Sequence, residues 1–433
     1  MLLERDTLKA VTRRIIPFLV LCYFLAFIDR VNVSVAALTM NRDLGFSQAV
    51  FGFGAGLFFV SYFFFEVPSN IIMQKVGARR WIARIMVSWG LVAGAMAFVQ
   101  GEQSFYALRL LLGVAEAGFF PAVLFYLSYW FPEAYRGRVF SYFLAAVPLA
   151  GIIGLPLSGL LLGLDGVLGL KGWQWLYLLE ALPSVIVGVI AYFYLTDQPA
   201  EAKWLTQDKR AWLVQSLRAE ADRPKQARPG NWSNLLDIRV ICFAAIHFCG
   251  NLAIYGLGFF LPQIVKTLGL TDLRASMVAA LPYVVGAIGM LYWGSRSDRG
   301  GDRRWNVFLP FVLSAFGFVG AASLSDPYLV VASLCLAAFG CLGYAPVFWT
   351  LPTAFLSGTA SAIAIAAINS IGNFAGFLGP FTVGYLRDAT GSFSAGLFAS
   401  AAVMTTGAIL ILLSTRGRAT ALVSPSSPKV AAE

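Results

Sequence analysis

The feature that most constrains this chain is its succession of long apolar runs. Twelve such runs, spread between residues 15 and 414, have the roughly 20 residues that a helix needs to cross the hydrocarbon core of a bilayer. Charged residues make up only 12% of the chain, about half of their share in a soluble domain. Backbone groups in lipid must bond internally, and helices achieve this. The sequence therefore predicts an all-α membrane protein with twelve transmembrane helices.

Lysine and arginine are distributed unevenly over the loops between these runs. With the N-terminus placed in the cytoplasm, most of the 32 basic residues fall on the cytoplasmic side. The basic residues in loops on the other side are Arg42, Lys171, Lys266, Arg274 and Arg387. This bias predicts that both termini are cytoplasmic. The expected location of the chain is the bacterial inner membrane. The bias also explains the net charge of +10, so nucleic acid is not an expected partner.

A long polar segment divides the twelve runs into two sets of six. We expect an N-terminal six-helix half at 1–196 and a cytoplasmic linker at 197–238. Apolar residues at helical spacing predict an amphipathic helix within this linker. A C-terminal six-helix half is expected at 239–418, followed by a disordered cytoplasmic tail at 419–433.

The two sets of runs share a basic loop. The loop after the second run reads NIIMQKVGARRW, and the loop after the eighth reads GSRSDRGGDRRW. Lys75 aligns with Arg299, and Gly77 aligns with Gly301. Repeated halves of this kind are typical of secondary transporters.

The second of these loops resembles the signature loop of the major facilitator superfamily. The first loop departs from the signature, with Asn70 for its first glycine and Gln74 for its aspartate. The stretches PSNIIMQKVGARRW, FLAFIDRVNVSVAA, RLLLGVAEAGFFPAVLFYLSYWFP and GWQWLYLLEALPS resemble one branch, the anion:cation symporter family of sugar-acid, tartrate and phthalate transporters. The resemblance implies the major facilitator fold, in which two halves rock and the signature loop acts as a cytoplasmic charge relay. The gating residues it implies are Lys75, Gly77, Arg79, Arg80, Gly294, Asp298, Arg299, Gly301 and Arg303.

Two apolar runs contain ionisable residues at membrane depth. Asp29 and Arg30 lie in the first run, and Arg109 and Glu116 lie in the fourth. Each such residue costs roughly 2.5–3.5 kcal/mol on insertion scales, and intramembrane charges usually have a function. The helical rise places all four at similar depth. Arg109 and Glu116 are two turns apart and therefore share one face of their helix.

These four residues are the expected centre of anion binding and proton coupling. Arg30 is expected to bind the substrate, because its planar guanidinium suits a carboxylate. Asp29 and Glu116, the latter with Arg109, are expected to couple transport to protons. Burial favours the neutral form of a carboxyl group, whereas a nearby arginine favours its ionised form, so such a group can both bind and release a proton. The resemblance implies the same roles. The alternative is that these charges are static ion pairs that hold helices together.

Neutral polar residues in the apolar runs are further candidates for substrate binding. They are Tyr23, Tyr126, Asn251, Tyr255, Trp349, Thr350, Asn369 and Asn373. Each also has a structural interpretation, as an interfacial anchor or a bridge between helices. His247 is interpreted as a packing donor, and Glu66 and Glu180 as structural groups near span ends. The second half has no charges that match the first, so it is expected to supply amides and aromatic rings.

These features together predict a secondary active symporter that imports an organic carboxylate with protons by alternating access. The alternatives are a proton-driven exporter of drugs or metabolites and a sodium-coupled anion symporter. The sequence has a single histidine and no metal-ligand or nucleotide-binding motif, so neither enzymatic activity nor a metal or cofactor is expected. The expected partners are a small organic anion, protons and the lipid bilayer, and the chain is expected to be monomeric.

Overall fold

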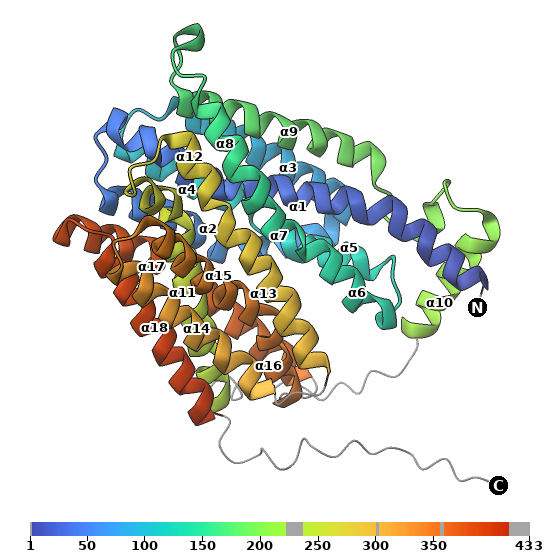
Figure 1. The fold of residues 1–433 in the computed structure, drawn as a ribbon. Coiled ribbons are helices and arrows are strands. Elements are labelled where there is room, and N and C mark those ends of the chain that lie inside the picture. The colour runs from blue at the N-terminus through green and yellow to red at the C-terminus, as the bar shows by residue number, and fades with distance from the viewer. Residues whose placement is uncertain (1, 222–236, 300–302, 356–358, 415–433) are drawn as a thin grey trace.

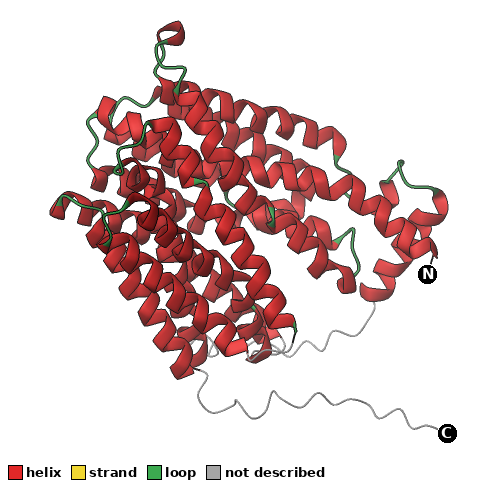
Figure 2. Ribbon diagram, in the orientation of Figure 1, coloured by secondary structure: helices red, strands yellow, loops and turns green. Residues whose placement is uncertain are grey.

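The computed structural model describes residues 2–221, 237–299, 303–355 and 359–414, and these residues form helices joined by loops (Figure 2). The first half contains α1 (Leu2–Leu44), α2 (Gln48–Val76), α3 (Ala78–Ala95), α4 (Glu102–Glu116), α5 (Phe119–Ser128), α6 (Glu133–Leu144), α7 (Ala146–Leu149), α8 (Leu155–Leu162) and α9 (Gly172–Tyr194). Helix α10 (Gln207–Ala221) follows. The second half contains α11 (Ile238–Lys266), α12 (Asp272–Ala279), α13 (Leu281–Asp298), α14 (Arg303–Ser323), α15 (Pro327–Phe348), α16 (Thr350–Phe355), α17 (Thr359–Thr390) and α18 (Ser394–Ser414).

Among the described residues, twelve helical segments are long and apolar enough to cross a membrane. Several of these spans are interrupted. Helices α4 and α5 together form the fourth span, α6 to α8 form the fifth, and α12 and α13 form the eighth. The fifth span contains a turn of π-helix at Ala150–Gly154. The predicted all-α fold with twelve spans is confirmed.

The two halves form two bundles of helices that lie side by side (Figure 1). They meet where α2 packs against α17 and where α1 packs against α11. Glycines allow the first of these contacts. A Cβ atom on Gly52 would lie 2.3 Å from the backbone oxygen of Pro380, and one on Gly56 would lie 2.7 Å from the backbone oxygen of Phe377. Small residues at this crossing therefore let the two halves approach closely.

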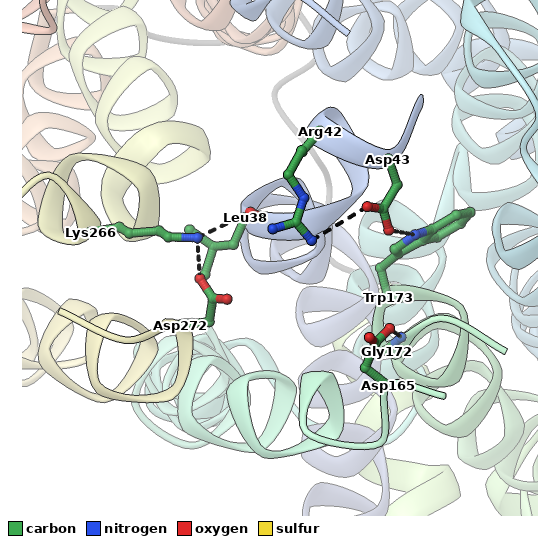
Figure 3. Close-up of polar contacts among 8 residues, drawn as sticks. All are labelled: Leu38, Arg42, Asp43, Asp165, Gly172, Trp173, Lys266 and Asp272. Carbon is green, nitrogen blue, oxygen red and sulfur yellow. Dashed lines mark hydrogen bonds and ion pairs between the residues drawn. The ribbon is translucent and has the colours of Figure 1, made fainter. Parts of the chain in front are cut away.

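The bundle has two ends, which we name by their loops. The N-terminus face carries the start of α1 together with α10, and the opposite face carries the loops that follow α1, α8, α11 and α17 (Figure 1). At the opposite face, the Asp388 carboxylate of α17 accepts hydrogen bonds from the backbone N–H groups of Gln48 (3.1 Å) and Ala49 (2.7 Å). Lys266 Nζ donates to the backbone oxygen of Leu38 (3.3 Å) and pairs with Asp272 (Figure 3). These contacts join the halves at the opposite face. The Asp388 carboxylate is favourable at the start of α2 because the N-terminal end of a helix carries a partial positive charge.

A helix forms within the predicted linker. Helix α10 packs on the N-terminal half, where Arg136 pairs with Glu220 (2.6 Å). Just before this helix, Trp204 stacks on Trp130 with ring centroids 5.3 Å apart. The rest of the predicted linker from residue 222 to 236, and the predicted tail at 419–433, lie outside the described residues.

Candidate substrate and ion site

The centre of the site is an ion pair between two helices of the N-terminal half. Arg30 of α1 pairs with Glu116, the last residue of α4. Their side chains are only 12% and 4% exposed. The Arg30 guanidinium also lies over the rings of Phe27 (4.7 Å) and Phe58 (5.1 Å). A charge-assisted hydrogen bond and aromatic faces therefore stabilise a cation inside the bundle.

The fourth span breaks immediately after Glu116. Gly118 has a φ of 87°, in the left-handed region that favours glycine. A Cβ atom there would lie 2.3 Å from Ser69 Oγ. The Ser69 hydroxyl donates to the backbone oxygen of Ala117 (2.6 Å) and accepts from Trp81 Nε1 (2.9 Å). The break is thus held by α2 and places Glu116 at a helix end, an arrangement that transporters use for substrate and ion sites.

Asp29 faces away from this ion pair. Its Oδ2 atom accepts hydrogen bonds from Ser184 Oγ of α9 (2.6 Å) and Trp89 Nε1 of α3 (3.0 Å). The residue is only 3% exposed. Adjacent residues on a helix point about 100° apart, so Asp29 and Arg30 contact different helices. Neither Trp89 nor Ser184 was a predicted site residue.

Arg109 is buried beside the ion pair but hydrogen-bonds to the backbone. Its Nη2 atom donates to the backbone oxygen of Ala55 in α2 (2.8 Å), and its guanidinium lies 5.3 Å from the ring of Phe58. Arg109 is within electrostatic reach of Glu116. Among the described residues, however, the ion-pair partner of Glu116 is Arg30.

Predicted tyrosines from both halves lie close to the ion pair. Tyr23 of α1 and Tyr255 of α11 are both within electrostatic reach of Arg30 and of Glu116. Tyr23 stacks on Phe143 with ring centroids 4.3 Å apart. The Tyr255 ring is 4.5 Å from that of Phe59 in α2, across the interface between the halves. The structure therefore brings these two predicted residues to the charged centre.

The C-terminal half contributes a neutral polar cluster. Asn251 Nδ2 donates to the backbone oxygen of Gly372 (3.1 Å) and lies 3.3 Å from His247 Nε2. The Tyr344 hydroxyl of α15 donates to Asn251 Oδ1 (3.2 Å). Tyr344 was not a predicted residue. Its only signal in the sequence is that a buried tyrosine hydroxyl needs a partner.

Three other predicted binding residues contact the backbone or a neighbouring ring. Tyr126 donates its hydroxyl to the backbone oxygen of Thr196 (2.9 Å), just beyond the end of α9. The Trp349 ring is 5.0 Å from that of His247, and Thr350 Oγ1 donates to the backbone oxygen of Val347 (2.7 Å). Two further predicted residues of α17 are half-buried, namely Asn369 and Asn373.

The first of the two basic loops is fixed by an aspartate that sequence reasoning missed. Asp197, which follows α9, accepts the backbone N–H of Arg79 (3.0 Å) and pairs with its Nε atom (3.1 Å). Gly77 has a φ of 94° and lies against the same carboxylate. In the second loop, Arg303 Nη1 donates to the backbone oxygen of Thr350 (3.3 Å).

The other predicted gating residues are at the surface or outside the described residues. Gly294 is half-buried. Gly301 lies outside the described residues. The exposed ones are Lys75, Arg80, Asp298 and Arg299.

The helical architecture and the buried charges define a class of membrane transporter. The model of the Major Facilitator Superfamily matches residues 19–380 and 243–430. The chain belongs to this superfamily, as predicted.

Individual relatives agree with this membership. The chain is 50% identical over 414 residues to a protein of Agrobacterium vitis named "Putative tartrate transporter", with 96% of each chain covered. It is 42% identical over 411 residues to the "Quinolone resistance transporter" of Acinetobacter baumannii, with 94% of this chain and 94% of the relative covered for that pair. The fold is similar to the solved structure of a bacterial homolog of the human lysosomal transporter Spinster, with a TM-score of 0.77 at 16% identity. That likeness covers 93% of this chain and 96% of the other. The chain is thus a multi-pass membrane transporter of a small molecule.

Proposed function

We propose that this transporter imports an organic carboxylate together with protons by alternating access. The observation that carries the proposal is the buried ion pair of Arg30 and Glu116 at the break in the fourth span. A proton can neutralise the carboxylate that pairs with a buried arginine. The arginine can then bind the carboxylate of a substrate in its place. Two arginines in this layer, Arg30 and Arg109, favour an anion as the substrate.

Competition for Arg30 links the proton to the substrate. When Glu116 takes up a proton, its charge is lost and the Arg30 guanidinium is left without an anionic partner. A buried unpaired cation is costly, so a substrate carboxylate becomes the favoured partner. When the proton leaves, Glu116 recovers Arg30 and displaces the substrate. Asp29 is the second proton-coupling group in this proposal.

Groups from the C-terminal half would select the rest of the substrate. Tyr255 lies near the ion pair across the interface. One turn earlier in α11, Asn251 supplies an amide group, and Tyr344 of α15 supplies a hydroxyl group beside it. Hydroxylated acids such as sugar acids or tartrate suit these donors and acceptors, and aromatic acids suit the rings of Tyr23 and Phe27. The name of the Agrobacterium relative supports a hydroxylated dicarboxylate.

The opposite face is the expected entry side. A cavity of about 370 Å³ lies there between the halves, and three basic residues line it, Arg42, Lys266 and Arg387. Basic walls attract anions and raise their local concentration. At this cavity, Asp388 of α17 accepts a hydrogen bond from the start of α2, and Lys266 donates to the backbone oxygen of Leu38, so that both contacts hold the halves together.

The proposed orientation follows from the distribution of basic loops. The N-terminus face is then cytoplasmic, the membrane is the bacterial inner membrane, and the protein acts as a monomer that does not bind nucleic acid. The halves at 1–196 and 239–418 would rock as units, with 197–238 as their linker. The pairing of Arg79 with Asp197 would be one contact remade at the cytoplasmic side in each cycle.

Proton-driven export of a drug is the second candidate. The observation that favours it is the 42% identity to the quinolone resistance transporter. Both functions use the same proton gradient, but they move the substrate in opposite directions across the membrane.

Transport by the purified protein in proteoliposomes tests the proposal. Under an inward proton gradient, we expect labelled tartrate or a labelled sugar acid to accumulate inside, and we expect a protonophore to abolish the accumulation. A sodium gradient alone should drive none. Efflux of a preloaded quinolone under the inward gradient, without uptake of any acid, would favour the second candidate instead.

A further inference from the structure

A second polar cluster lies inside the N-terminal half, on the side of α1 that faces away from Arg30. It contains two carboxyl groups, Asp29 of α1 and Glu180 of α9, which are 3% and 4% exposed. Glu180 is within electrostatic reach of Asp29. The sequence interpretation of Glu180 as a structural group near a span end does not account for this position.

The geometry of the two helices brings the carboxyl groups together. Ser184, which donates to Asp29, lies one turn from Glu180 on the same face of α9. Asn32 lies one turn from Asp29 on the same face of α1 and approaches Glu180. Because α1 and α9 pack against one another, these four side chains form facing pairs.

The cluster contains polar atoms without partners. Asp29 Oδ1, Glu180 Oε2 and both polar atoms of Asn32 are buried and have no hydrogen-bond partner within the described part of the chain. Asn32 is only 1% exposed. Buried polar atoms are nearly always paired. The vacant acceptors of two carboxyl groups, with an amide directed at one of them, therefore indicate a site for a small cation.

In the part of the chain that the structure describes, no basic side chain forms an ion pair with this pair of carboxyl groups. Among the ion pairs of the described residues, none involves Asp29 or Glu180. The ionisable groups within reach are Glu116 for Asp29 and Tyr177 for Glu180, and neither is a cation. Arg30 is taken by Glu116, and the charged or ionisable groups within electrostatic reach of Arg109 are Tyr177, Glu116 and Arg30.

Two carboxylates in one dry site cannot both remain ionised. We infer that Asp29 and Glu180 form a proton-binding pair, in which Glu180 is a further coupling residue. Asp29 accepts two hydrogen bonds, from Ser184 and Trp89, whereas Glu180 accepts one, from Ser158 Oγ (2.7 Å). Hydrogen bonds to a carboxylate favour its ionised form. The proposal therefore places the last proton of the closed, dry pair on Glu180, which releases it when alternating access opens the site to water.

This inference rests on the proposed function, and it adds one proton-binding group to that cycle. Each coupled proton that moves down a difference of one pH unit contributes about tenfold to the accumulation ratio of the substrate. Loss of Glu180 as a proton carrier should therefore lower the accumulation ratio by a measurable factor. A permanently protonated, purely structural Glu180 would instead be replaced by glutamine without effect on coupling.

The test compares Glu180→Gln with wild type in proteoliposomes at an inward gradient of one pH unit. We expect counterflow exchange to survive in Glu180→Gln, while the accumulation ratio falls about tenfold, by one coupled proton. Glu180→Asp should restore the ratio because it restores a carboxyl group. Glu102→Gln, the same change at an exposed position in the first turn of α4, is the matched control and should leave the ratio unchanged.

The possible outcomes separate a failure of the Asp29–Glu180 pair from a failure of the proposed transport function. An unchanged accumulation ratio in Glu180→Gln would overturn this inference and leave the proposed function intact. Accumulation driven by sodium alone would overturn the assignment of the proton to this pair. Failure of the wild-type protein to accumulate any acid would overturn the proposed function and this inference with it.

An infrared measurement covers the case in which Glu180→Gln does not fold. A protonated carboxyl group has its own carbonyl band. We expect such a band in the wild-type protein at neutral pH and expect Glu180→Asp to shift it. A spectrum that Glu180→Asp leaves unchanged would overturn the inference.

Discussion

Glu116→Gln removes one charge from the ion pair at the centre of the site. The substitution keeps the shape of the side chain but leaves the Arg30 guanidinium, 12% exposed, without an anion. Removing one partner of a buried pair costs about 3–5 kcal/mol. We expect a loss of about 3 kcal/mol, the lower end of that range, because the glutamine oxygen and the rings of Phe27 and Phe58 still face the arginine.

The assay is denaturant unfolding of the purified protein in mild detergent, with the free energy taken from the midpoint and slope. Replacing both members of the pair with methionine, as Arg30→Met with Glu116→Met, should recover most of the loss, because a buried pair and an apolar pair are often similar in stability. Glu102→Gln again serves as the exposed control. Wild-type stability of Glu116→Gln, or no recovery in the double variant, would refute the ion pair.

Three further changes probe other parts of the account. Gly118→Ala should lower the free energy of unfolding by at least about 2 kcal/mol, because a left-handed residue with a Cβ costs about 1–2 kcal/mol before its overlap with Ser69 is counted. Tyr344→Phe should cost about 1–3 kcal/mol, since it leaves the Asn251 oxygen without its donor, and it should raise the KM for uptake. Asp388→Asn should weaken the closure at the opposite face, and a cysteine at position 48 should then react faster with an impermeant thiol reagent.

Each of these expectations has a contrary outcome. Wild-type stability of Gly118→Ala would mean that the fourth span is continuous past Glu116. An unchanged KM in Tyr344→Phe would separate the neutral cluster from substrate selection. Equal labelling rates with and without Asp388→Asn would show that this carboxylate does not hold the halves closed.

The charged members of the site could be predicted because they stand out against an apolar sequence. Asp29, Arg109 and Glu116 proved to be buried, and the Arg30 side chain is only 12% exposed. Their pairing could not be predicted. It depends on the rotation of α1 about its axis and on the break in the fourth span at Gly118, and neither follows from spacing within one helix.

The neutral members were harder to predict than the charged ones. Trp89, Ser184 and Tyr344 have no feature that separates them from packing residues in an apolar run. Their place in the site is recognised only from the hydrogen bonds that they make to residues of a neighbouring helix. Glu180 was interpreted as a structural group near a span end, and its hydrogen bond with Ser158 Oγ and its proximity to Asp29 could not be predicted from spacing within one helix.

The two basic loops could be predicted from the sequence, but their contact partners could not. Their repetition predicted a gating element, and the structure places Arg79 and Arg303 in polar contacts. The partner of Arg79 is Asp197, more than 100 residues away along the chain. A single sequence contains no signal that links such distant positions.

Proton uptake on substrate binding tests the central claim most directly. Purified protein in weakly buffered solution is mixed with its acid, and the pH change is recorded against the amount bound. If a substrate carboxylate displaces Glu116 from Arg30, binding should take up about one proton for each Glu116 that was ionised, and the Kd should rise up to about tenfold for each pH unit. Glu116→Gln should bind without that proton. Substrate binding by the wild-type protein with no proton uptake and a Kd independent of pH would contradict the account.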